Sequence, residues 1–252
     1  MSPMSPSDVQ LKIPGRKYGK PIPMTEEDIQ DVINRFVFTA KIARESGFDG
    51  IQLHSAHGYL LSQFLSPDIN QRSDAWGGSL ENRARIHLEI IKKCREEVGN
   101  DFAISIKMNS ADFQKGGFSP EDSIQVAKLF SDSGIDNIEI SGGTYEQPRL
   151  LGLDKVSINP KRSENRKEST IAREAYFLSY AEEIAKVVNI PLMVTGGFRT
   201  KEGMESALSE GACEIVGIGR PLCALVLHLC PPFGQRAWLG HQSSHKVGGA
   251  VR

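Results

Sequence analysis

Residues 47–59 read GFDGIQLHSAHGY, and the fold can be worked out from this stretch. Residues 50–54 (GIQLH) predict a short buried strand that follows a helical pattern over residues 25–47. Thr25 is suited to cap the start of that helix, and Gly47 lies just past its end. A helix that leads directly into a short buried strand is the repeating unit of α/β proteins.

The same alternation continues along the chain to residue 219. Further helices are predicted over residues 79–98, 119–134, 169–188 and 200–210, and further strands over residues 103–108, 137–141, 191–196 and 214–219. The strands are near-continuous apolar runs, as expected where both faces of a parallel sheet are buried. Helices between parallel strands suit right-handed crossovers, so the pattern predicts a (β/α) barrel or an open doubly wound sheet.

The number of strands does not fill a complete barrel. An eight-stranded barrel takes about 250 residues, and the chain has 252. Only five strands are predicted, because residues 1–24, 58–79 and 143–168 are expected to be irregular. Residues 221–252 lack Asp and Glu and contain PP, SS and GG pairs, so we expect residues 230–252 to form a poorly ordered tail.

Composition and charge exclude several classes of protein. The chain has 30 basic and 31 acidic side chains, a net charge of -1, which argues against binding to nucleic acid or to a membrane surface. Neither a long apolar run nor a secretory signal pattern is found, so we expect a cytoplasmic protein. The four cysteines fit neither a disulfide framework nor a zinc ribbon, and they are Cys94, Cys213, Cys223 and Cys230.

Ligands of such sheets bind at the carboxyl ends of the strands, where His54, His57 and Tyr59 follow the first predicted strand. Two neutral imidazoles can bind an oxygen that gains negative charge, and the Tyr59 hydroxyl can donate a proton. Two other interpretations stay open. The histidines can be structural, or they can form a metal pair, although no third ligand stands at a standard spacing.

Lys107 lies within the apolar run 103–108, where a charged side chain must be paired or functional because burying an unpaired charge is costly. It can form a Schiff base, as in a barrel lyase that binds a phosphorylated substrate, or place positive charge beside an electron-rich ring.

Glycines follow the last two predicted strands, with an arginine after the second. Such junctions can bind a phosphate through backbone N–H groups, a helix N-terminus and the arginine. The residues concerned are Gly196, Gly197, Gly219 and Arg220. Alternatively, these glycines only close tight turns.

Two motifs resemble the old yellow enzyme family of FMN-dependent oxidoreductases. The first is GFDGIQLHSAHGYLLSQFLSP at residues 47–67, and the second is N-x-R-x-D-x-W-G-G-S-x-E-N-R-x-R at residues 70–85. The resemblance covers roughly residues 5–223. The second histidine of the His-x-x-His motif resembles the NADPH dehydrogenase-like branch of the family. The other large branch has Asn at this position.

The resemblance implies a TIM barrel with FMN at its mouth. NADPH or NADH would reduce the flavin, which would pass a hydride to the β-carbon of an α,β-unsaturated carbonyl or similar acceptor. His54 and His57 would bind the substrate oxygen, Tyr59 would protonate the α-carbon, and Lys107 would lie near flavin N1–O2. The FMN phosphate would be held by Gly196, Gly197, Gly219 and Arg220.

Members of this family carry three further β/α units ahead of the matching region. The resemblance therefore implies a partial (β/α)8 barrel with strands four to eight, and residues 1–229 as its FMN-binding domain. The alternative is an inactive truncated remnant, or an interaction subunit, whose barrel is completed by another chain. The partner expected for the chain is either this completing chain or a further copy in a homo-oligomer.

Overall fold

The computed structural model of the chain describes residues 3–13, 17–144, 177–198 and 200–219. The chain divides into two units, Met1–Gly217 and Ile218–Arg252. Every helix and strand described below belongs to the first unit, and only residues 218 and 219 of the second are described. The predicted tail at 230–252 lies outside the described residues.

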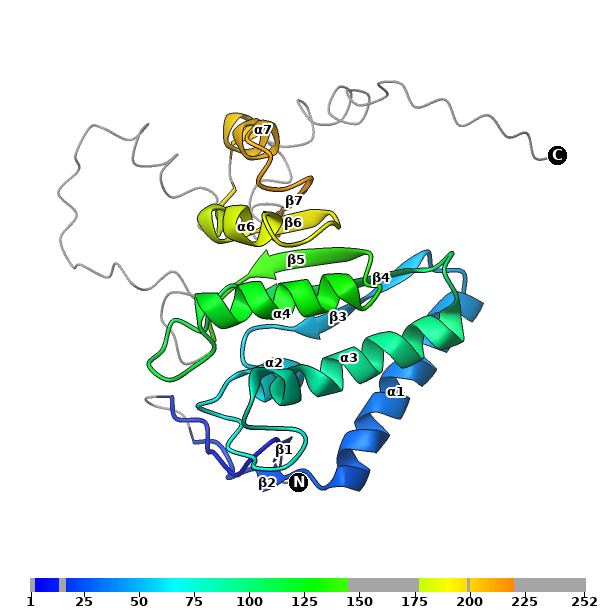
Figure 1. Cartoon of the computed structure of the whole chain (residues 1–252), viewed down its shortest axis with the longest axis vertical. Helices are drawn as coiled ribbons and strands as arrows, with labels where there is room; N and C mark the ends of the chain where they lie inside the picture. Colours follow the sequence, from blue (N-terminus) through cyan, green and yellow to red (C-terminus); the bar gives the residue numbers. More distant parts are fainter. Residues whose placement is uncertain (1–2, 14–16, 145–176, 199, 220–252) are drawn as a thin grey trace. The chain divides into compact units, whose positions relative to one another are not determined.

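Five parallel strands form the larger sheet, in the order β3-β4-β5-β6-β7 (Figure 1). They are β3 (Gly50–Ser55), β4 (Ala103–Asn109), β5 (Asn137–Ser141), β6 (Leu192–Thr195) and β7 (Ile215–Gly217). The spatial order follows the sequence without a reversal, as in a barrel wall, whereas a doubly wound sheet reverses at a switch point. The prediction of five parallel strands is confirmed, and their order favours the barrel.

Helices connect the strands and pack on neighbouring helices in the sequence α1–α3–α4–α6. They are α1 (Glu26–Glu45), α2 (Leu60–Leu65), α3 (Leu80–Val98), α4 (Pro120–Asp132), α6 (Leu178–Ala185) and α7 (Lys201–Ser209). The predicted cap of α1 is confirmed, because Thr25 Oγ1 accepts from the backbone N–H of Asp28 at 3.2 Å. The Asp28 carboxylate accepts in return from the backbone N–H of Thr25 at 2.8 Å, which completes a capping box.

None of the described helices is long and apolar enough to cross a membrane. Cys94 and Cys213 are buried free thiols. Cys223 and Cys230 lie outside the described residues.

On β3 and β4 one face is buried and much of the other is exposed or partly exposed, so the prediction of strands buried on both faces is wrong for these two strands. On β5 both faces are buried, because Glu139 and Ser141 are 4% and 5% exposed. In β4, Ile104 and Ile106 are fully buried, whereas Ser105 and Lys107 are partly exposed. The buried side chains join one core with apolar residues of the helices. The opposite side of the sheet, called the inner face below, carries polar side chains, and on β3, β4 and β5 these include Gln52, His54, Ser105, Lys107, Asn137 and Glu139.

Two regions expected to be irregular contain regular elements. Within residues 1–24, the short strands β1 (Met4–Ser5) and β2 (Ile22–Pro23) pair in parallel. Within residues 58–79, α2 forms a short helix whose apolar side is buried. These elements are too short for sequence periodicity to predict them.

Arg72 joins the β1–β2 pair to the segment after α2. Its guanidinium donates to the carbonyls of Pro6 at 3.0 Å and Met24 at 2.6 Å, and it pairs with Asp74 at 2.5 Å. Nearby, the Asn70 amide donates to two further carbonyls at 2.8 Å. These two residues of the second motif therefore hold the scaffold together.

We expect Arg72→Met to lower the free energy of unfolding by about 2–3 kcal/mol, because half-buried carbonyls lose a charged donor. Proteolysis within residues 3–24 should become faster. Chemical denaturation and limited proteolysis measure the two effects. The control is Arg35→Met on α1, where the pair with Asp31 is exposed and its loss should cost less than about 0.5 kcal/mol. Equal losses for both variants would contradict this anchoring role.

Candidate active site

The three residues singled out after the first strand lie together. His54 is on β3, His57 follows it with a left-handed backbone (φ 64°), and Tyr59 occupies the position just before α2. The ring of His54 lies 5.4 Å from that of His57 and 5.1 Å from that of Tyr59, centre to centre. Tyr59 is 46% exposed, so this cluster faces a place that a ligand can reach.

His57 is held by two residues that sequence reasoning did not place in the site. Its backbone N–H donates to Asn109 Oδ1 at 3.1 Å, and its Nε2 lies 2.8 Å from Ser141 Oγ. The Asn109 amide also donates to Asp112 at 2.9 Å and to the carbonyl of Gly143 at 3.1 Å. Asn109 thus ties together the loops after β3, β4 and β5. In the sequence, only the positions of Asn109 and Ser141 at the carboxyl ends of β4 and β5 indicated that these two residues belong to the site.

Both imidazoles are held in their neutral form. Burial, followed by the Lys107 ammonium and then by His54, lowers the pKa of His57 to about 4, although Glu139 opposes the shift. Partial loss of hydration and the Lys107 ammonium also lower the pKa of His54. A neutral imidazole donates one N–H and accepts at its other nitrogen. If Ser141 donates to Nε2 of His57, the ring proton stands on Nδ1, where it can serve a ligand oxygen.

Lys107 is paired. Its Nζ lies 2.6 Å from Glu139 Oε1, and the two residues are directly opposite each other in the register of β4 and β5. The pair with Glu139 meets the expectation that a lysine within an apolar run is paired or functional. Glu139 was missed, although it interrupts the apolar run 137–141 just as Lys107 interrupts 103–108.

The turn after β6 contains Gly196 and Gly197, both with positive φ (136° and 88°). Positive φ favours glycine at both positions, and a Cβ at Gly196 would also lie 2.9 Å from the ring of Phe177. The turn and its packing therefore account for these glycines without a phosphate. Gly219 belongs to the second unit and Arg220 lies outside the described residues, so the phosphate site formed by these four residues stays a prediction.

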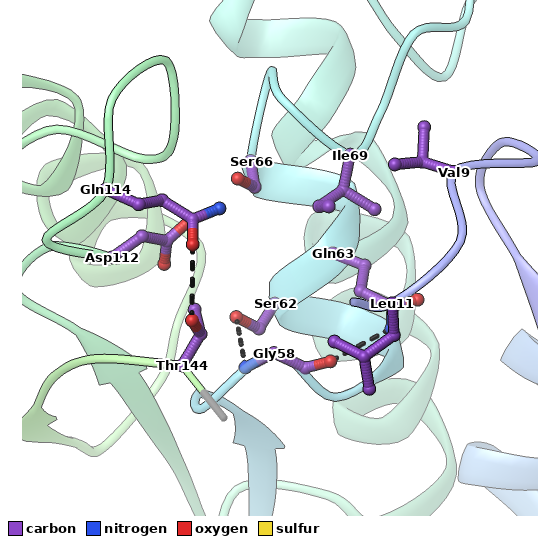
Figure 2. A pocket seen from close by; sticks show the side chains of 10 residues that line it. All are labelled: Val9, Leu11, Gly58, Ser62, Gln63, Ser66, Ile69, Asp112, Gln114 and Thr144. Atoms are coloured by element: carbon purple, nitrogen blue, oxygen red, sulfur yellow. Dashed lines mark hydrogen bonds between the residues drawn. The ribbon is translucent and has the colours of Figure 1, made fainter. Parts of the chain in front are cut away.

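A small cavity of about 70 Å³ adjoins the loop that carries His57 (Figure 2). Figure 2 shows residues of α2 and the N-terminal segment on one side, and residues after β4 and β5 on the other. It has room for a few water molecules, whereas cofactor pockets are about 300–1,000 Å³. Its lining residues include Leu11, Gly58, Ser62, Asp112 and Thr144.

The described residues fit a flavin in their donor chemistry. Lys107 offers a cation on the inner face, and His54 and His57 offer neutral N–H donors beside it. Within the described ranges, no group of three metal-ligating side chains occurs.

A sequentially ordered parallel sheet with polar groups at its carboxyl ends defines a protein of the (β/α)-barrel class. The sequence model of the NADH:flavin oxidoreductase / NADH oxidase family matches residues 1–225. The chain therefore belongs to this family, that of old yellow enzyme, and its five strands form part of the TIM barrel.

Individual relatives support this assignment. An NADH-dependent flavin oxidoreductase (iliE) of Hypocrea jecorina is 41% identical over 209 residues, which are 81% of this chain and 49% of that protein. The complex of 2-naphthoyl-CoA reductase with 2-naphthoyl-CoA has a TM-score of 0.75 and 30% identity, over 88% of this chain and 31% of that one. The old yellow enzyme homologue of Zymomonas mobilis has a TM-score of 0.66 and 25% identity, over 88% of this chain and 58% of that one. The chain thus spans about half the length of the first relative.

We expect His57 to stay neutral down to about pH 4 in an NMR titration of the histidine ring signals. The unfolded chain takes up this proton first, at about pH 6.5, so the free energy of unfolding should fall as the pH drops from there toward 4. His57→Gln removes the signal and part of that dependence. Another part of the pH dependence comes from His87, which is fully buried and has a pKa of about 3. Its ring signal serves as an internal control. A His57 midpoint near 6.5 would contradict the neutral imidazole.

Proposed function

We propose that this chain carries the substrate-activating half of an FMN-dependent NAD(P)H oxidoreductase. The observation that supports it most directly is the cluster of His54, His57 and Tyr59 beside Lys107 on the inner face. Bound FMN would supply hydride transfer, from NADH or NADPH to an acceptor such as an α,β-unsaturated carbonyl compound.

The two imidazoles would bind and polarise the oxygen of the acceptor. As neutral donors, they hold a developing negative charge without giving up a proton. His57 is anchored at both its backbone and its ring, so its N–H direction is set before a ligand arrives. Such preorganisation is what makes an oxyanion site effective.

Tyr59 would donate the proton that completes the reduction. Its ring packs edge-on against that of His54, a contact that supports this role. Lys107, together with Gly196, Gly197, Gly219 and Arg220, would hold the flavin and its phosphate. The name of the Hypocrea jecorina relative favours NADH as the hydride donor, although the histidine pattern resembles the NADPH dehydrogenase-like branch.

The alternative is a subunit whose site is completed by another chain or by a second copy. Two observations favour it. Within the described part of the chain, β3 and β7 each have a neighbour in the larger sheet on one side only. Inner-face residues such as Gln52 are exposed.

Flavin retention separates these two functions. The purified chain is mixed with FMN, desalted and examined by visible absorbance, and then titrated anaerobically with NADH and with NADPH. Retained flavin that is bleached by either nucleotide is the expected result. A colourless chain would reject the proposed activity for the chain by itself, and native mass spectrometry would then test for a partner.

We expect Tyr59→Phe to slow reduction of an unsaturated carbonyl by about a hundredfold or more. Bleaching of the flavin by the nicotinamide should keep its rate, because Tyr59 delivers no proton in that step. Rapid-mixing absorbance measures the two half-reactions separately. Tyr18→Phe, in the N-terminal segment, removes the same hydroxyl elsewhere and should change neither rate. A loss in both half-reactions would contradict the role of Tyr59 as proton donor.

A further inference from the structure

An ion pair stands in the middle of the inner face, beside the histidine cluster. Lys107 on β4 lies opposite His54 on β3 and opposite Glu139 on β5, so the three residues form one row across the sheet. The Lys107 ammonium lies 2.6 Å from Glu139 Oε1, and the two side chains are 17% and 6% exposed. A pair this sheltered is less screened by water and salt than a surface pair.

The carboxylate of Glu139 is also fixed from its other side. Gln52 Nε2 donates to Glu139 Oε2 at 2.9 Å and lies 3.2 Å from Ser105 Oγ. Both carboxylate oxygens therefore have partners, one from β3 and one from β4. This double contact leaves Glu139 little freedom to turn away from Lys107.

The contacts with Lys107 and Gln52 keep the carboxyl group of Glu139 ionised. Burial is the largest single influence and raises the pKa of Glu139, but its hydrogen bonds, the one from Lys107 foremost, act together with the Lys107 charge to leave the pKa below its ordinary value. The positive charge of Lys107 is thus partly cancelled by a negative charge a few ångströms away. Without Glu139, His54 and any ring bound over the inner face would experience the full field of the lysine.

We propose that Glu139 is a positioning residue that fixes the Lys107 ammonium and offsets its charge over His54 and the flavin. The flavin part of this inference rests on the proposed function. A flavin beside an uncompensated cation is easier to reduce, since reduction adds negative charge to its ring. Glu139 would therefore keep the reduction potential of the bound flavin lower than Lys107 by itself would set it.

The first test uses the chain without flavin. We expect Glu139→Gln to lower the midpoint of the His54 ring signal in an NMR titration by about half a pH unit, because the lysine field is no longer offset. The matched control is Glu97→Gln, which makes the same change in charge at the Lys41–Glu97 pair between the outer helices α1 and α3. It should leave His54 unchanged. An unchanged His54 midpoint in Glu139→Gln would overturn the inference.

A double variant guards against a change in folding. Lys107→Gln with Glu139→Gln removes both charges, and the His54 midpoint should return close to that of the unsubstituted chain. A midpoint that stays at the value of the single variant would show that packing, and not charge, had moved it. This result would also overturn the inference. Melting curves confirm that each variant is folded.

The second test applies to the chain loaded with FMN. Glu139→Gln should shift the midpoint potential of the flavin to a more positive value, and Glu97→Gln should not. An unchanged potential in a Glu139→Gln variant that retains flavin would overturn the inference. If the unsubstituted chain retains no flavin, the proposed function fails, and the His54 titration then decides the role of Glu139.

Discussion

The register between β3, β4 and β5 is the constraint on which the candidate site depends. It sets His54, Lys107 and Glu139 side by side on one face of the sheet. A slip of one residue would turn a strand over and press a charged side chain into the apolar core. The register is held by the other face, where Ile104 and Ile106 are fully buried in that core. The hydrophobic core thus determines where the polar groups stand.

The loops at the carboxyl ends of the strands are held in place by hydrogen bonds. Asn109 bonds to the loops after three neighbouring strands, and His57 keeps a left-handed backbone within that network. A residue other than glycine holds such a conformation only where its surroundings fix it. An imidazole fixed in this way needs little rearrangement to meet a ligand, which suits electrostatic stabilisation of a developing charge.

The motifs that led to the family serve two different purposes. Arg72, from the second motif, binds carbonyls of the N-terminal segment and holds the scaffold. His54 and Tyr59, from the first, are exposed at the carboxyl end of β3. The resemblance to the family rests on both motifs together, whereas the chemistry proposed here depends on the first motif and on Lys107. The paired glycines after β6 have structural reasons of their own, so they support a phosphate site less strongly than their sequence suggests.

The sequence by itself predicted five strands and the cap at Thr25, and it placed His54, His57 and Tyr59 close together after the first of those strands. These features depend on periodicity and on residues close together in the chain. Only the tertiary structure decided which face of each strand is buried, and that β1 pairs with β2. It also joined Lys107 to Glu139, 32 residues away, and His57 to Ser141, 84 residues away. Such contacts depend on the register between strands distant in the chain, which packing of the whole core sets and local sequence does not record.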